Sequence, residues 1–137
     1  MIVTDQEARV KKGALSLLHV ERDADRRLIT SVALQLDNEI QVISCPNITV
    51  AAIKMQAFRL QFDAVIIDSV PTTSTEVSAL DRFRYHARAT ALPLIFLTSR
   101  LMRHEVAAMR ELGSVGIIGK PFDPLTLSMQ VRELLSA

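Results

Sequence analysis

Ala64-Val-Ile-Ile-Asp68, Leu94-Ile-Phe-Leu-Thr98 and Val115-Gly-Ile-Ile-Gly-Lys120 decide the fold, because each is a short apolar run that ends at a polar residue. Such runs are typical of strands that are buried on both faces of a parallel sheet. The carboxyl ends of parallel strands lie at one edge of the sheet, where ligands bind. We therefore expect the three terminal polar residues to meet at that edge. A carboxylate, a hydroxyl and an ammonium group placed together favour phosphate chemistry on Asp68.

The composition is that of one globular domain: 137 residues, 49% of them hydrophobic and 23% charged. The net charge of +1 argues against nucleic acid as a direct electrostatic partner. No apolar stretch approaches the roughly 20 residues that span a bilayer, and the first residues lack the apolar region of a signal peptide. The single Cys45 excludes an intrachain disulfide and a zinc site built from several cysteines. We predict a cytoplasmic protein with no membrane partner.

Strand and helix patterns alternate along the rest of the chain. Strands are expected at residues 15–20, 39–44, 64–67, 94–97 and 115–118, and helices at 25–36, 48–59, 75–87, 102–112 and from Asp123 onward. Asn47 is expected to cap the second helix, Gly113 to end the fourth, and Asp123-Pro124 to start the last.

This alternation predicts a flavodoxin-like three-layer (βα)5 sandwich, with a parallel five-stranded sheet in the order 2-1-3-4-5. Residues 1–13 are expected to be a polar lead-in and residues 14–137 the domain. The last helix runs almost to the end of the sequence, so we expect no output domain on this chain.

The motifs at the strand ends resemble a known family. They are Ile67-Asp68 with Pro71 nearby, Leu97-Thr98-Ser99, and Gly119-Lys120-Pro121-Phe122-Asp123-Pro124. From about Leu15 to Leu135 the chain resembles the receiver domain of two-component response regulators, which are signalling proteins rather than enzymes.

The resemblance implies a role for each residue at the strand ends. Asp68 would accept a phosphoryl group in a phosphorelay, from a sensor histidine kinase or a histidine phosphotransfer protein. Thr98, Ser99 and Lys120 would bind that phosphoryl group, and the Lys120–Pro121 peptide bond would be cis.

The resemblance also implies a magnesium site, and here the sequence departs from the family pattern. The metal ligands map to Glu21, Asp68 and the backbone carbonyl of Val70, but Arg22 replaces the second acid that follows the first strand. A fixed cation at a metal-ligand position repels the metal ion, so we expect Mg²⁺ binding to be weak or absent. Two interpretations of Arg22 stay open: its side chain points to solvent, or it pairs with Asp68 in place of the metal.

The expected switch residues are Thr98 and Ile117, and Ile117 stands where the family has an aromatic ring. The partner surface would be the helix at 102–112, the strand at 115–118 and the last helix, and the same surface would serve a homodimer.

The alternative function is a phosphorylation-independent interaction module on the same fold. A small α/β enzyme or flavin binder is disfavoured, because Glu21-Arg22-Asp23 stands where a glycine-rich phosphate loop would lie. His19 is expected to be a buried sheet histidine.

Overall fold

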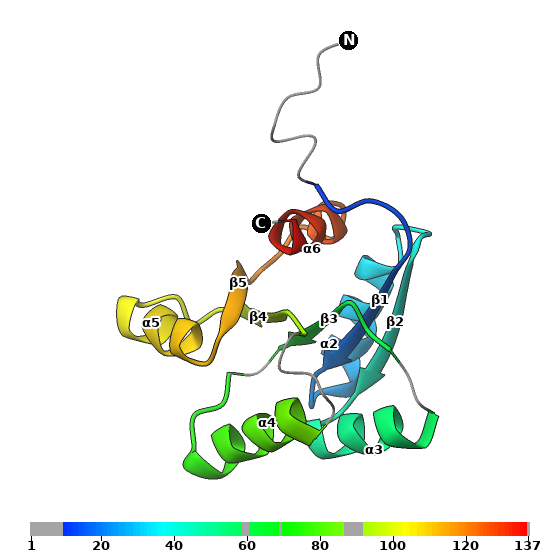
Figure 1. The fold of residues 1–137 in the computed structure, drawn as a ribbon. Coiled ribbons are helices and arrows are strands. Elements are labelled where there is room, and N and C mark those ends of the chain that lie inside the picture. The colour runs from blue at the N-terminus through cyan, green and yellow to red at the C-terminus, as the bar shows by residue number, and fades with distance from the viewer. Residues whose placement is uncertain (1–9, 59–60, 69, 87–91, 137) are drawn as a thin grey trace.

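The computed structural model describes residues 10–58, 61–68, 70–86 and 92–136. Its strands form one parallel sheet in the order β2-β1-β3-β4-β5, which confirms the predicted topology (Figure 1). The strands are β1 (Leu15–Val20), β2 (Ile40–Cys45), β3 (Ala64–Ile67), β4 (Leu94–Thr98) and β5 (Ser114–Gly119).

Helices cover both faces of the sheet, as a parallel sheet with crossover helices requires. One face packs against α2 (Ala24–Leu34) and α6 (Leu127–Leu135). The other face packs against α3 (Ile48–Phe58), α4 (Ser74–His86) and α5 (Arg103–Glu111). No helix in the described part of the chain is long and apolar enough to cross a membrane.

The strands supply two hydrophobic cores through their alternating side chains. In β1, Leu15 and Leu17 join the core under α2 and α6, whereas Leu18 and Val20 join the core under α3, α4 and α5. All four residues of β3 are buried, as expected for the central strand. This strand therefore holds the residue that follows it, Asp68, in the middle of the sheet edge.

Helix α2 matches the predicted segment but buries a different face from the one its apolar pattern suggests. It ends at Leu34, two residues before the predicted end, and it buries Thr30, Ala33 and Leu34. Leu28, Ile29 and Val32 are all more than half exposed. The buried face places Ala33 and Leu34 in the core and Thr30 Oγ1 within 3.5 Å of Asp68 Oδ2.

The predicted helix ends are partly confirmed. Asn47 Oδ1 accepts a hydrogen bond of 2.8 Å from the Val50 N–H, and Gly113 has a φ of +86° just after α5. The prediction that Asp123 caps the last helix is wrong, because the helix begins at Leu127. Asp123 Oδ1 instead accepts from the Leu125 N–H at 2.9 Å and stabilises a turn before the helix. The predicted residue 59 of the second helix, residue 87 of the third and the start of the lead-in lie outside the described residues.

Candidate functional site at the carboxyl edge of the sheet

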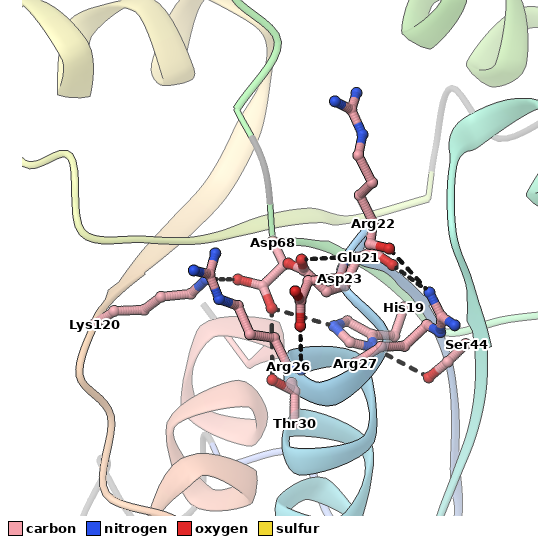
Figure 2. A network of polar contacts seen from close by, with 10 residues as sticks. All are labelled: His19, Glu21, Arg22, Asp23, Arg26, Arg27, Thr30, Ser44, Asp68 and Lys120. Carbon is pink, nitrogen blue, oxygen red and sulfur yellow. Dashed lines mark hydrogen bonds and ion pairs between the residues drawn. The ribbon is translucent and has the colours of Figure 1, made fainter.

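Asp68 lies directly after β3 and is the centre of the polar cluster at the carboxyl edge (Figure 2). Its N–H donates a hydrogen bond of 2.9 Å to the Val20 carbonyl, which continues the ladder between β1 and β3. Its side chain is 0% exposed, and Oδ1 forms an ion pair with Lys120 Nζ. The predicted convergence of strand ends is therefore observed for this pair.

A second group of residues contacts the other carboxylate oxygen. His19 Nε2 lies 3.6 Å from Asp68 Oδ2, and Thr30 Oγ1 donates to the same oxygen at 3.5 Å. His19 is fully buried, and its Nδ1 lies 3.1 Å from Ser44 Oγ. Sequence reasoning placed His19 in the sheet but missed its contact with Asp68. The available signal was a histidine on the buried strand β1, two residues before Glu21, the acid that follows this strand.

Burial and hydrogen bonding act in opposite directions on the pKa of Asp68. Desolvation raises this pKa, but the close contacts of the carboxylate with His19 and Lys120 and the charge of Lys120 outweigh it, so the pKa lies below its ordinary value. The carboxylate is therefore ionised at neutral pH. An ionised carboxylate is the form that can act as a nucleophile.

Glu21 is the second buried carboxyl group at this edge. Burial raises its pKa above the ordinary value, and the neighbouring Asp68 carboxylate raises the pKa further. A hydrogen bond of 2.9 Å from the Asp23 N–H to Glu21 Oε1 acts in the opposite direction. Two carboxyl groups with opposite pKa shifts therefore lie close together at one buried edge of the sheet.

Thr98 and Lys120 are held next to each other by the β4–β5 pairing. The Lys120 N–H donates to the Thr98 carbonyl at 2.9 Å, and the Lys120–Pro121 bond is cis, as we expected. Thr98 is buried, and its Oγ1 accepts a hydrogen bond of 3.0 Å from the Arg100 N–H. Ser99 is exposed at the same turn.

A polar cavity of about 330 Å³ lies above these residues. It is lined by Arg22, Arg26, Asp68, Val70, Thr72, Glu76, Thr98, Ser99, Arg100 and Lys120. The cavity brings the predicted phosphoacceptor and the three predicted phosphoryl-binding residues to one place. It also contains arginines that the sequence analysis did not assign to the site.

The donor set fits magnesium poorly. Among the described residues, no three His, Cys, Asp or Glu side chains are grouped so that they could hold a metal ion. Asp68 Oδ1 is paired with Lys120, and Glu21 Oε1 accepts the Asp23 N–H. Mg²⁺ requires near-octahedral oxygen coordination, so two carboxylates that are already engaged are a weak site. Val70 lines the cavity, but the residue before it lies outside the described part.

Arg22 does not take the place of the metal. Its side chain is exposed and extends away from Asp68 in Figure 2, so of the two open interpretations the structure supports solvent exposure. Arg27 Nη1 donates to the carbonyls of Glu21 at 2.9 Å and of Arg22 at 3.3 Å. The main chain of this loop is therefore held by an arginine, and the ammonium group of Lys120 is the cation on Asp68.

Known structures share this arrangement of strands and helices. A chemotaxis protein CheY4 from Vibrio cholerae superposes with a TM-score of 0.74 at 23% identity, covering 89% of this chain and 99% of that one. The chain has the receiver-domain fold. A response regulator from Thermotoga maritima gives a TM-score of 0.74 at 20% identity, covering 90% of this chain and 99% of that one. The receiver domain of the Francisella response regulator 1452 gives a TM-score of 0.70 at 17% identity, covering 88% of this chain and 96% of that one.

Sequence comparison alone is less informative. No protein-family model matches the chain. A protein described as "Probable transcriptional regulator ycf29" from Porphyra purpurea is 28% identical over 93 residues. The match covers 65% of this chain and 44% of that protein, so less than half of the relative's length is represented. The likeness to receiver domains therefore rests on the fold.

Proposed function

We propose that residues 14–137 are a response regulator receiver domain that accepts a phosphoryl group on Asp68 and thereby switches a partner-binding surface. One observation carries this proposal: Asp68 lies at the carboxyl edge of a receiver-type sheet, paired with Lys120 and beside Thr98, at the base of a polar cavity. A ligand-binding crevice at this edge is what the topology favours.

The proposed reaction is a phosphoryl transfer from a phosphohistidine of the donor protein to Asp68. One carboxylate oxygen attacks phosphorus, a P–O bond forms, and the P–N bond breaks with its electrons leaving on the imidazole, which takes up a proton. The lowered pKa keeps Asp68 ionised for this attack. The Lys120 ammonium and the hydroxyls of Thr98 and Ser99 line the space where the phosphoryl oxygens would lie. Positioning and charge stabilisation of this kind supply most of the catalysis in phosphoryl transfer.

Lys120 also controls access to the nucleophile. The Asp68 side chain is 0% exposed while Lys120 remains 22% exposed, so the carboxylate is covered in this state. The lysine must move from Oδ1 before a donor can approach. We therefore expect transfer to be slow compared with receivers whose carboxylate is open.

A series of contacts leads from Asp68 through Lys120 and Thr98 to α5, which is part of the proposed partner surface. The Thr98 hydroxyl now accepts from the Arg100 N–H at 3.0 Å, and the Arg100 side chain forms an ion pair with Glu105 in α5. A Thr98 hydroxyl that turned to donate to a phosphoryl group would change this turn. Ile117 in β5 is half-buried against the core under α5 and would repack with it.

Exposed apolar residues lie where the proposed partners would bind. Leu28, Ile29 and Val32 form an exposed stripe on α2, whose first turn adjoins the cavity through Arg26. Exposed apolar patches favour protein docking, and this stripe suits the helical surface of a histidine kinase or histidine phosphotransfer protein. Met102 and Val115 are exposed on the α5–β5 side, where a homodimer would form.

A second candidate function is a phosphorylation-independent interaction module. The observation that favours it is the Lys120–Asp68 ion pair, which already covers the carboxylate, together with the poor fit to Mg²⁺. In that case the partner would bind the surface of the unmodified domain.

Treatment with acetyl phosphate, with and without Mg²⁺, distinguishes the two functions. The first function predicts that the intact protein gains one phosphoryl group that hydroxylamine removes, and that Asp68→Asn gains none. Asp63→Asn is a matched control, because Asp63 lies exposed at the opposite end of β3. The absence of a labile phosphoryl group on wild type, with partner binding unchanged in Asp68→Asn, would support the second function.

A further inference from the structure

His19 is a buried histidine that the reaction described above does not use. It lies in β1 and points to the α2 side of the sheet, the side to which Leu15 and Leu17 also point. Its side chain is 0% exposed, and Figure 2 shows the imidazole between Ser44 and Asp68. Because an unpaired polar group inside a protein is costly, the partners of this ring indicate what it does.

Ser44 fixes the orientation of the ring and the place of its proton. The pairing of β1 with β2 sets Ser44 directly opposite His19, and His19 Nδ1 lies 3.1 Å from Ser44 Oγ. A hydroxyl can donate to Nδ1, whereas the ionised carboxylate of Asp68 can only accept. The proton of a neutral imidazole therefore belongs on Nε2, the nitrogen that faces Asp68.

The Nε2–H group is a donor that the resting structure leaves unused. Nε2 lies 3.6 Å from Asp68 Oδ2, farther than the about 2.7–3.2 Å of an ordinary hydrogen bond, and has no hydrogen-bond partner among the described residues. The other oxygen, Oδ1, is paired with Lys120, which must move before a phosphoryl donor can approach. The buried carboxylate then loses its cation, and Nε2–H is available beside it.

We propose that His19 is a positioning residue for Asp68, whose Nε2–H holds Oδ2 inward while Oδ1 faces the phosphoryl donor. This inference rests on the proposed function, because it concerns the same reaction. The two carboxylate oxygens are inequivalent: Oδ2 has the contacts with His19 and Thr30, and Oδ1 has the contact with Lys120, which lines the cavity. The attacking atom is therefore Oδ1.

The same hydrogen bond shortens the life of the phosphorylated state. In an aspartyl phosphate, Oδ2 is an uncharged carbonyl oxygen. When water attacks phosphorus, the P–Oδ1 bond breaks, its electrons stay on the carboxyl group, and both water protons end on the released phosphate. Negative charge returns to Oδ2 in this step, and an N–H donates a stronger hydrogen bond to a charged oxygen than to a neutral one. His19 therefore stabilises the transition state of release more than the acyl phosphate.

The first test is the half-life of the phosphoryl group on Asp68 after acetyl phosphate has been removed. His19→Leu should lengthen this half-life about tenfold, the effect of one charge-assisted hydrogen bond. His19→Gln should restore a half-life near that of wild type, because its side-chain amide can donate to Oδ2. Leu17→Val is the matched control, since it alters a buried position on the same side of β1 but removes no polar group, and its half-life should equal that of wild type.

The second test uses the unmodified protein. In ¹⁵N NMR spectra of histidine-labelled protein near neutral pH, His19 should carry its proton on Nε2. The resonance of this proton should move upfield in Asp68→Asn, because an amide oxygen is a weaker acceptor than a carboxylate. A proton on Nδ1 instead, or an Nε2–H resonance that Asp68→Asn leaves in place, would overturn the inference.

Failure of the inference and failure of the proposed function give different results. If wild type takes no phosphoryl group, the proposed function fails, and the NMR result alone decides whether His19 holds Asp68. If Asp68 is phosphorylated but His19→Leu and wild type lose the group at equal rates, only the inference fails. It also fails if Leu17→Val lengthens the half-life as much as His19→Leu, because the effect would then come from packing.

Discussion

Two buried charged clusters lie at opposite edges of the same sheet, and they are built differently. At the amino edge, Arg132 of α6 donates to Asp37 Oδ2 at 2.8 Å and to the carbonyls of Lys11 and Gly13 at 2.9 Å each. At the carboxyl edge, Asp68 pairs with Lys120, and its other oxygen has only the longer contacts of 3.5 and 3.6 Å to Thr30 and His19.

The two clusters differ in how completely the domain itself pairs their buried charges. The guanidinium of Arg132 has an acceptor for each of its three nitrogens, so the cluster is complete within the domain. The carboxyl edge combines two carboxyl groups, Glu21 and Asp68, with opposite pKa shifts below a cavity. Perturbed groups of this kind gather at functional sites. We therefore expect substitutions at the two edges to differ in their effect on stability.

The largest effect is expected for Arg132→Met. Breaking a buried ion pair by removing one partner costs about 3–5 kcal/mol, and the partial exposure of Asp37 places this change at the low end, about 3 kcal/mol. Urea unfolding followed by circular dichroism measures the loss. The exposed Arg103→Met should change the free energy of unfolding by less than about 0.5 kcal/mol. A loss below about 1 kcal/mol for Arg132→Met would remove the distinction between the two edges.

Asp68→Asn should change the free energy of unfolding much less, by under about 1 kcal/mol. Asparagine keeps the shape of the aspartate side chain and one acceptor oxygen. The substitution removes the ion pair with Lys120, but it also relieves the repulsion between Asp68 and Glu21, and Lys120 can turn to water. The same urea titration measures this variant beside Arg132→Met. Equal losses for the two variants would show that the carboxyl edge is as structural as the amino edge.

The two edges should also differ in their response to pH. The raised pKa of Glu21 means that the folded state holds its proton more tightly than the unfolded state, so this contribution to stability is present at low pH and is lost as pH rises through the raised pKa. Glu21→Gln should therefore raise the melting temperature at pH 7, and the gain should disappear near pH 4, about the ordinary pKa of glutamic acid.

Asp37→Asn is the matched variant of opposite sign. The Arg132 hydrogen bond lowers the pKa of Asp37, so its contribution is present above the ordinary carboxyl pKa and is lost as pH falls through the lowered pKa. This variant should lose stability at pH 7 and approach wild type in strong acid. If the melting temperatures of Glu21→Gln and Asp37→Asn differed from wild type in the same direction at pH 7, the directions assigned to the two pKa shifts would be contradicted.

The smallest effect is expected for magnesium binding. Wild type should bind Mg²⁺ weakly, and Arg22→Asp should strengthen binding a few-fold, because it adds a third carboxylate beside Glu21 and Asp68. The gain is modest because Arg22 extends away from the site. Calorimetry with Arg103→Asp as control measures this. Equal affinity in Arg22→Asp and wild type would show that position 22 cannot reach the ion.

The sequence allowed prediction of everything that depends on strand order. A parallel sheet brings the ends of β3, β4 and β5 to one edge, so Asp68, Thr98 and Lys120 could be placed together from three apolar runs. The sequence did not reveal the contacts of His19 and Thr30 with Asp68. These residues come from a strand and a helix, and their meeting depends on side-chain direction and on the rotation of α2, for which the apolar pattern was misleading. The start of α6 was missed because Asp123 can stabilise either a helix or a turn.

The most direct test of the central claim is to map the phosphorylated residue. Acyl phosphate on aspartate is reduced by borohydride to homoserine, so peptide mass spectrometry after treatment with acetyl phosphate identifies the modified position. The account predicts homoserine at position 68 and unmodified carboxyl groups at Glu21 and Asp63. Modification at Glu21, or a phosphoryl group on His19 with position 68 unchanged, would contradict the assignment of Asp68 as the phosphoacceptor.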